Sequence, residues 1–377
     1  MTTRILHVIP TLVQGGAEKQ LTLLARQLLQ ERFDVHVCVL THSGPLQSQL
    51  TTAGIPIHEI NKSWKVDPGA YLRLKHCIQK VRPEIVHTWL FAANSYGRAA
   101  ACGANVNRIV AAERCVDWWK SWYELAIDRK LAQRTDRIVT NSNGVRDFYA
   151  QHGIDQNKFT VIPNGISPLA SHSGENARES ASNTREKLLQ KFDIPTDARI
   201  VGAVGRLWAQ KNYKDLIWSH HLLDELRGDV HLVILGEGPE RWRLERYARQ
   251  VDLKGSVHFL GHREDVGSWI PHFDCFWLAS SYEGQSNALM EAMQAGIPVV
   301  VSDIPGNRDL VVHEESGVIV PVRDRFKFAQ QTNLLFEDAA LAERLGAAAR
   351  ERMRSEFSVT KMVQRHVTLY NELTSTS

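Results

Sequence analysis

Short, almost continuously apolar runs alternate along this chain with longer amphipathic stretches. The first run, Ile5–Ile9, is followed by a turn-rich segment at 10–16 and then by leucines that recur on one helical face, at Leu21, Leu24, Leu28 and Leu29. Apolar runs without polar alternation are typical of strands buried on both faces of a sheet. The first half therefore predicts a parallel sheet with intervening helices, with further strands at 35–40, 85–87, 109–112 and 138–141.

The same alternation begins again in the second half, where apolar runs predict strands at 200–204, 231–235, 257–259, 275–278 and 299–302. Between the halves, residues 168–185 are mostly small and polar, which is typical of an exposed linker. We therefore predict an α/β protein with two doubly wound, Rossmann-like domains facing each other across a cleft. The predicted domains are 1–167 and 168–355, and the final segment, 356–377, has a helical pattern over 357–373.

Length and composition agree with a globular protein of two domains. The chain has 377 residues, of which 43% are hydrophobic and 23% charged, close to the globular average. Its apolar runs are far shorter than the roughly 20 residues of a membrane span, and the N-terminal run is too short for a signal peptide. The five cysteines form no close pair, which argues against a zinc framework or a disulfide scaffold. We expect a soluble, cytoplasmic protein with reduced thiols.

Charge is distributed unevenly between the two halves. Residues 1–167 contain 20 Lys and Arg against 13 Asp and Glu, whereas residues 168–377 contain 25 against 29. A basic N-terminal half favours an anionic partner such as a membrane surface or a polyphosphate, although simple scatter between two surfaces explains the difference equally well. The chain has no block of five like charges, so we expect no nucleic-acid partner.

In open parallel sheets, ligands bind in the loops that follow the strands. Gly15 and Gly16 form such a loop after the first strand, where free backbone amides and a helix N-terminus can bind an anion; a plain tight turn explains the pair as well. The corresponding loop of the second half carries Arg206 and Lys211. A planar guanidinium and a point charge together suit a diphosphate, but two surface cations near a turn are also common.

The most specific pattern lies between residues 281 and 293. Glu283 stands at a strand-to-helix turn, and Glu291 is expected about two helical turns into the helix that follows. The residues at 284–288 can offer free amides at a helix N-terminus, which suits a phosphate or an array of sugar hydroxyls. Glu291 can accept the two adjacent hydroxyls of a ribose. Either glutamate alone is ordinarily a solvated or capping carboxylate, but the combination with an apolar flank is much less generic.

These motifs resemble those of the retaining glycosyltransferase family 4, the group 1 glycosyltransferases, which have the GT-B fold of two Rossmann-like domains. Glu283 to Glu291 is similar to the family's signature of two glutamates separated by seven residues, and Glu291 to Val300 is similar to the segment that usually follows it. Further landmarks occur in the expected order over nearly the whole chain: Gly15-Gly16, Pro163-Asn164-Gly165, Gly205-Arg206 with Lys211, and Gly236 to Pro239. The resemblance also implies that the C-terminal helix crosses back onto the N-terminal domain.

The resemblance implies a role for each matching residue. Arg206 and Lys211 would neutralise the donor diphosphate, Glu291 would hold the donor ribose, and Glu283 would contact the donor sugar near the reacting carbon as an electrostatic stabiliser. Neither a metal nor another cofactor is expected, in keeping with the absence of an Asp-x-Asp triplet. The loop with His262 and Arg263 would receive the base. The full set of expected donor-binding residues is Gly15, Gly16, Arg206, Lys211, His262, Gly284, Gln285, Ser286, Asn287, Ala288, Leu289 and Glu291.

The sequence departs from the family pattern near the acceptor. Many relatives carry a functional His two residues after a first His, but this chain reads His87-Thr88-Trp89. His87 is then the candidate acceptor-side catalytic residue, alongside Glu283; a buried structural role for His87 is an equal alternative.

Three tryptophans and a tyrosine fall within residues 115–123, at Trp118, Trp119, Trp122 and Tyr123. If exposed, such a cluster with Lys120 would suit a sugar platform or a membrane interface. We expect it to be buried or partly buried, because tryptophans at i and i+4 fit one helix face.

The sequence predicts a retaining, metal-independent glycosyltransferase of cell-envelope or exopolysaccharide synthesis. Its expected partners are a nucleotide-diphospho-sugar donor, a glycan or lipid-linked acceptor and, peripherally, the inner face of the membrane. Two alternatives stay open: a sugar-nucleotide epimerase on the same scaffold, and an inactive nucleotide-sugar-binding subunit of a glycan-assembly complex.

Overall fold

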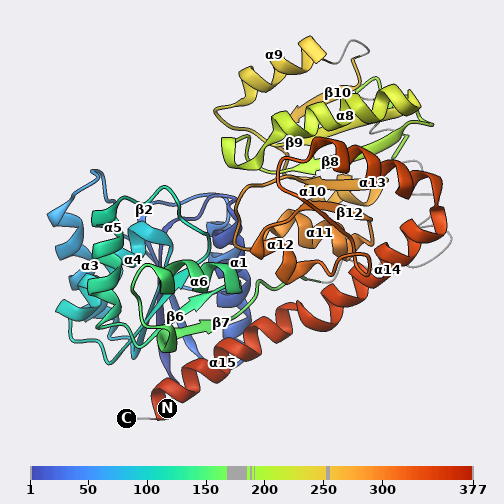
Figure 1. Cartoon of the computed structure of the whole chain (residues 1–377). Coiled ribbons are helices and arrows are strands. Elements are labelled where there is room, and N and C mark those ends of the chain that lie inside the picture. The colour runs from blue at the N-terminus through green and yellow to red at the C-terminus, as the bar shows by residue number, and fades with distance from the viewer. Residues whose placement is uncertain (1, 168–184, 187–188, 191, 252–254, 376–377) are drawn as a thin grey trace. The chain divides into compact units, whose positions relative to one another are not determined.

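The computed structural model of the chain describes residues 2–167, 185–186, 189–190, 192–251 and 255–375. Two compact units make up the structure (Figure 1): unit 1 contains Met1–Gly165 and Val359–Ser377, and unit 2 contains Ile166–Ser358. The predicted linker, 168–185, lies outside the described residues except for Arg185. No helix among the described residues is both long enough and apolar enough to cross a membrane.

Unit 1 is built on a seven-stranded parallel sheet with the strand order β3-β2-β1-β4-β5-β6-β7. The strands are β1 Arg4–Thr11, β2 Asp34–His42, β3 Ile57–Glu59, β4 Ile85–Trp89, β5 Arg108–Glu113, β6 Arg137–Thr140 and β7 Phe159–Val161. The helices are α1 Gly16–Leu28, α2 Gln47–Thr52, α3 Pro68–Val81, α4 Leu90–Gly103, α5 Trp122–Ala132, α6 Asn143–Gln151 and the C-terminal α15 Val359–Ser375, with a short 3-10 helix, η1, at Gln156–Lys158.

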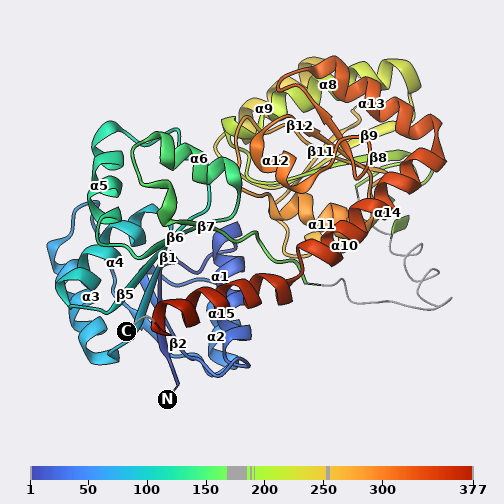
Figure 2. The same cartoon turned by 60° about the horizontal axis from the view of Figure 1, so that its bottom comes forward.

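Side chains of β1 alternate between two apolar layers, as the two-residue period of a strand requires. Ile5 and Ile9 belong to a core that contains residues of α1 and α15, whereas Leu6 and Val8 belong to a core that contains residues of α3 and α4. Arg108, the first residue of β5, donates from Nε to the carbonyl of Leu373 at 2.6 Å. This bond ties the C-terminal end of α15 to the sheet. Figure 2 shows α15 running beside α1.

Unit 2 repeats this plan in a six-stranded parallel sheet with the order β10-β9-β8-β11-β12-β13. The strands are β8 Arg199–Val204, β9 Val230–Leu235, β10 Val257–Gly261, β11 Cys275–Leu278, β12 Val299–Ser302 and β13 Val318–Val320. The helices are α8 Tyr213–Arg227, α9 Arg241–Val251, α10 Val266–Trp269, α11 Asn287–Ala295, α12 Pro305–Leu310, α13 Arg325–Glu337 and α14 Ala339–Glu356, with 3-10 helices η2 at Ala209–Lys211 and η3 at Ile270–His272.

The predicted α/β class with two Rossmann-like parallel sheets is confirmed. In each sheet the chain first builds strands to one side and then crosses back, so that β4 lies beside β1 and β11 lies beside β8. Such reversals of strand order are where doubly wound sheets bind ligands. The loops that begin at Leu12 in unit 1 and at Gly205 and Ala279 in unit 2 leave strands at these two points.

The expected burial of the tryptophan cluster is wrong. Trp118, Trp119 and Trp122 are 65%, 56% and 80% exposed. The spacing argument fails because α5 begins only at Trp122; Trp118 and Trp119 lie in the preceding loop and share no helical face with it.

Candidate active site

Backbone hydrogen bonds join three loops at the carboxyl edge of the unit 2 sheet. The amide of Gly205 donates to the Leu235 carbonyl at 3.0 Å, and the amide of Leu207 donates to the Glu237 carbonyl at 2.9 Å. The amide of Gly236 donates to the Gly261 carbonyl at 2.8 Å, which bonds the loop after β9 to the end of β10. The segments that follow β8, β9 and β10 therefore form one continuous rim.

Gly236 permits this close approach. Its φ is 149°, and a Cβ atom there would lie only 1.9 Å from the carbonyl oxygen of Gly205. Any larger residue would separate the loop after β9 from the loop that carries Arg206.

The loop after β11 is bonded to the same rim. The amide of Ser281 donates to the Gln210 carbonyl at 2.8 Å, and Asn212 donates through Nδ2 to the Ala279 carbonyl at 2.8 Å and to Ser281 Oγ at 2.7 Å. Asn212 adopts a left-handed conformation, with φ 51°, which aims its amide at the β11 loop. Two segments about 70 residues apart in sequence are thus fixed together.

Lys211 and Glu283, which the sequence analysis selected separately, form an ion pair in this rim. Their side chains are 15% and 10% exposed, and Ser280 Oγ donates to Glu283 Oε1 at 2.8 Å. Burial, together with the charge of Glu283, raises the pKa of Tyr213, whose hydroxyl donates to the Gly205 carbonyl at 3.1 Å. The pair thus places a cation and a carboxylate side by side at the strand-order reversal of unit 2.

Helix α11 starts next to this ion pair. Ser286 is its N-cap and accepts a long hydrogen bond, 3.4 Å, from the amide of Leu289. The Leu289 side chain is fully buried in the core, so only the backbone of Leu289 can contact a ligand. Gln285 and Ser286 are buried, and Gly284 is buried beside them, while Asn287 and Ala288 are half-buried. Glu291 is half-buried and lies about one turn into the helix, not two as expected, because α11 begins at Asn287.

Arg206, His262 and Gly16 are the exposed members of the predicted donor set. Arg206 follows Gly205 directly, and its side chain makes no hydrogen bond or ion pair with any other described residue. The neighbouring Arg263 is instead engaged by Asp265, with hydrogen bonds of 2.7 and 2.6 Å. Arg206 is therefore a cation that can turn toward an anionic ligand at low cost.

The start of α12 packs directly on the β11 loop, which leads to a stability prediction. A Cβ atom on Gly306 would lie 1.8 Å from the Gly284 carbonyl oxygen and 3.1 Å from that of Glu283. Gly306→Ala is therefore expected to lower the free energy of unfolding of unit 2 by about 3 kcal/mol or more. The matched control is Gly267→Ala on α10, where a Cβ atom meets nothing within 4 Å. Urea unfolding of both variants measures the difference; equal midpoints would refute the close packing.

In unit 1, Gly15 is the N-cap of α1 and Gly16 its first residue. The carboxylate of Glu18 folds back over this turn: a Cβ atom on Gly15 would lie 2.1 Å from Glu18 Oε2. Glu18 Oε1 also accepts a hydrogen bond of 3.2 Å from Thr11 Oγ1. A carboxylate thus already lies at the helix N-terminus where the sequence predicts a phosphate, and the role of Gly15 and Gly16 stays a prediction.

His87 is fully buried in a cluster of aromatic side chains. Its Nδ1 lies 2.7 Å from the Tyr370 hydroxyl of α15, and its ring packs on Trp89 with 4.9 Å between ring centroids. Trp89 is also buried and donates from Nε1 to His7 Nδ1 at 3.1 Å. These contacts favour the structural role for His87; its catalytic role stays a prediction, and Trp89 cannot supply a titratable group in place of the usual histidine.

Among the residues that the structure describes, no group of three or more His, Cys, Asp or Glu side chains is arranged to hold a metal ion.

Two family models match this chain. The model described as Glycosyltransferase Family 4 matches residues 14–168, and that described as Glycosyl transferases group 1 matches residues 184–352, so that together they cover well over half of it. The chain belongs to glycosyltransferase family 4. It is a glycosyltransferase, and the resemblance drawn from its motifs is confirmed.

Individual relatives of this glycosyltransferase agree with that assignment. It is 26% identical to the UDP-Gal:alpha-D-GlcNAc-diphosphoundecaprenol alpha-1,3-galactosyltransferase of Escherichia coli, over 98% of this chain and 97% of that protein. It is 27% identical to the putative glycosyltransferase EpsF of Bacillus subtilis, over 80% and 79% of the two chains. The crystal structure of Anabaena Alr3699/HepE in complex with UDP and glucose is similar, with a TM-score of 0.86 at 20% identity over 98% of this chain and 99% of that one. The GT-B fold is thereby confirmed.

Proposed function

We propose that this glycosyltransferase takes a sugar from a nucleotide-diphospho-sugar, without a metal ion, and transfers it with retention of anomeric configuration. The acceptor is a glycan or a lipid-linked sugar in cell-envelope or exopolysaccharide synthesis, and the enzyme works in the cytoplasm at the inner face of the membrane. The observation that supports this most is the joined rim of unit 2, which places the ion pair of Lys211 and Glu283 beside the N-terminus of α11.

The donor diphosphate is assigned to the two cations of the rim. Lys211 offers three donors on a compact charge and Arg206 a planar fork, and together they offset the charge that the leaving diphosphate gains in the transition state. Glu291 accepts the ribose hydroxyls. The loop after β10, with His262, receives the base, and the backbone of Gly284 to Leu289 lies along the sugar and phosphate.

Glu283 is assigned to the donor sugar. Its carboxylate is held by Ser280 and Lys211, and a carboxylate near the anomeric carbon stabilises the positive charge that develops there. The bond from that carbon to the diphosphate oxygen breaks while a bond to the acceptor oxygen forms on the same face. The acceptor proton passes to the leaving phosphate oxygen, so that a nucleoside diphosphate and the glycoside are the products.

The donor base is proposed from the relatives. The Escherichia coli galactosyltransferase is named for a UDP-sugar, and solved structures of Alr3699/HepE hold UDP and UDP-glucose. UDP-galactose and UDP-glucose are therefore the first donors to test, with a sugar diphosphate on a polyprenyl lipid as the first acceptor.

The test is a transfer reaction followed by NMR of the new glycosidic bond, with and without EDTA. An anomeric proton in the donor's configuration, formed equally well with EDTA, is the expected result. Inverted configuration or dependence on a divalent cation would contradict the proposal. Donor binding without any turnover across a range of acceptors would favour the inactive subunit, and a new nucleotide-sugar would favour the epimerase.

A further inference from the structure

Unit 1 carries a group of exposed apolar side chains on two neighbouring loops. One loop, between β3 and α3, exposes Trp64 and Val66 by 75% and 77%; the other, between β5 and α5, exposes Trp118 and Trp119 and continues into Trp122 and Tyr123 of α5. These six residues are called the aromatic face below. Exposed apolar groups of this size ordinarily mark a surface that binds something.

Contacts with α4 hold the two loops side by side. The hydroxyl of Tyr96 accepts from the Asp67 amide at 2.7 Å and donates to the Lys65 carbonyl at 3.4 Å. One helical turn earlier, Phe91 packs edge-on against Trp119, with 5.6 Å between ring centroids. Both loops also follow strands of the same parallel sheet, so they leave it at the same edge.

A buried charge network fixes the second loop. The Lys120 ammonium is completely buried and lies 2.9 Å from Asp128, 3.2 Å from Asp117 and 2.6 Å from the Tyr149 hydroxyl. Lys120 thus points inward while its neighbours Trp118, Trp119 and Trp122 point outward. Breaking such a network leaves a buried charge unpaired, so the tryptophans are held in their exposed positions.

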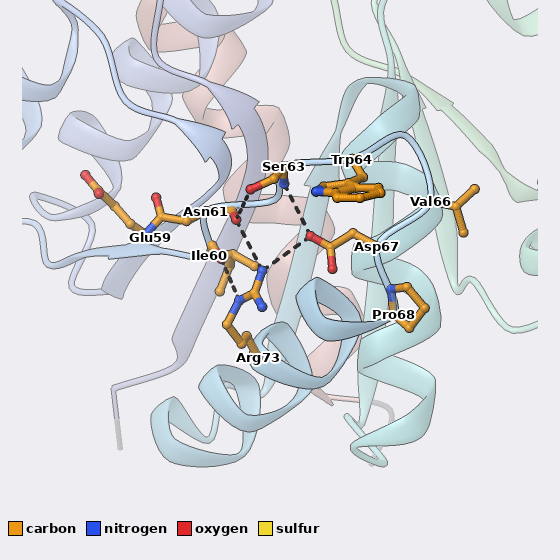
Figure 3. Close-up of a pocket in the computed structure, with 9 residues that line it drawn as sticks. All are labelled: Glu59, Ile60, Asn61, Ser63, Trp64, Val66, Asp67, Pro68 and Arg73. Carbon is orange, nitrogen blue, oxygen red and sulfur yellow. Dashed lines mark hydrogen bonds and ion pairs between the residues drawn. The ribbon is translucent and has the colours of Figure 1, made fainter.

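The first loop is fixed by Arg73. Figure 3 shows its guanidinium between the carbonyl groups of Ile60 and Asn61, at 2.8 and 3.2 Å, and the Asp67 carboxylate, at 3.4 Å. These groups line a cavity of about 540 Å³, whose lining also includes Trp64 and Val66. Because the Arg73 guanidinium already bonds to these carbonyl and carboxylate groups, it holds the loop in place and does not leave the cavity a free anion site.

Cations lie in the same two segments as the aromatic face. Lys62 and Lys65 flank Trp64, and Arg129 and Lys130 are exposed in the last turn of α5. Unit 1 as a whole has 22 Lys and Arg against 14 Asp and Glu. A second copy of the chain would bring these like charges together across a symmetric interface, which is unfavourable.

We propose that the aromatic face docks unit 1 on a membrane surface that contains anionic phospholipid. Tryptophan and tyrosine are enriched at the headgroup level of bilayers, because their rings are apolar and their N–H or O–H groups remain hydrated. Lysine and arginine around them attract anionic headgroups. The docking requires neither donor nor acceptor, so it can fail or succeed independently of the proposed sugar transfer.

The test is flotation of the full chain with phosphatidylcholine vesicles, with and without phosphatidylglycerol. The wild type is expected to float with the anionic vesicles, and less so at high salt. Trp118→Ala/Trp122→Ala is expected to weaken this binding about tenfold or more, because each indole buries a large apolar area on docking. Trp242→Ala in unit 2, at a tryptophan 62% exposed, is the matched control and is expected to change nothing.

Because the replaced side chains are exposed, the double variant is expected to keep the wild-type thermal unfolding midpoint. Lys65→Glu is expected to weaken binding to the anionic vesicles alone. Failure of the wild type to bind vesicles, or equal binding by wild type and double variant, would overturn the proposal. A dimer that the double variant dissociates, or quenching of the tryptophans by soluble glycans, each without vesicle binding, would also overturn it.

Discussion

Replacing Lys211 by alanine is expected to lower kcat/KM for sugar transfer by about 10³-fold. The ammonium is one of two cations assigned to the leaving diphosphate, and it also pairs with the mostly buried Glu283. Its loss removes charge stabilisation from the transition state and leaves the carboxylate held by Ser280 alone. Initial rates with UDP-galactose or UDP-glucose measure the effect.

Lys214→Ala provides the matched control for that variant. Lys214 is an exposed lysine three residues further on, and its ammonium lies over the ring of Tyr247, at 4.7 Å from the ring centroid, not in the rim. We expect kcat/KM of the Lys214→Ala variant to stay within about twofold of that of the wild type. If both lysine variants lost activity equally, or neither did, Lys211 would have no special part in the reaction.

Acidification is expected to destabilise unit 1. His7, His87 and His366 are fully buried beside one another, and His87 contacts Tyr370. Burial is the main cause that lowers the pKa of His7 and of His366 from 6.5 to about 3, and it holds the pKa of His87 well below 6.5. The charge of the buried Arg114 lowers the pKa of His87 and His366 further.

The sign follows from proton binding. Below pH 6.5 the unfolded chain binds protons at these histidines. The folded chain binds none at His7 and His366 until about pH 3, and the lowered pKa of His87 acts in the same direction, so stability present above pH 6.5 is lost as the pH falls. Glu113 acts in the opposite direction, because burial raises its pKa from 4.5 to about 7 and the folded state takes up that proton first. The net loss between pH 7 and pH 5 is about 3 kcal/mol.

Hydrogen exchange of peptides from β1 and β4, followed by mass spectrometry at both pH values, measures this loss within unit 1. His366→Leu removes one of the three histidines and is expected to reduce the loss to about 1 kcal/mol. His76→Leu, at an exposed histidine of α3, serves as the matched control and should keep the full pH dependence. An unchanged pH dependence in His366→Leu would show that the buried cluster does not cause it.

The sequence predicts the longer strands well because they are buried on both faces. Runs such as Cys275–Leu278 and Val299–Ser302 coincide with β11 and β12. The strands β3, β7 and β13 were not predicted. Each has only three residues and lies at the edge of its sheet, so its apolar run is short. Local pattern carries little information about such edges.

Side-chain contacts between segments that are distant in sequence could not be predicted from the sequence. The loops with Lys211 and Glu283 could be selected separately, since each follows a predicted strand, but their ion pair depends on β8 and β11 being neighbours. Lys120 shows the same limit: its partners lie at the end of β5, in the loop before α5, in α5 and in α6. Its burial turns the surrounding tryptophans outward, which their spacing alone does not reveal.

The central claim is that the rim of unit 2 binds a nucleoside diphosphate through its own cations. Calorimetric titration of the full chain with UDP, GDP and ADP, in EDTA, tests it most directly, with Arg206→Ala beside Arg354→Ala, an arginine whose side chain is 76% exposed on α14. We predict that one nucleoside diphosphate binds without metal, that Arg206→Ala weakens it by about tenfold or more, and that Arg354→Ala leaves it unchanged. Absence of binding by all three nucleotides, or binding that Arg206→Ala leaves intact, would contradict the claim.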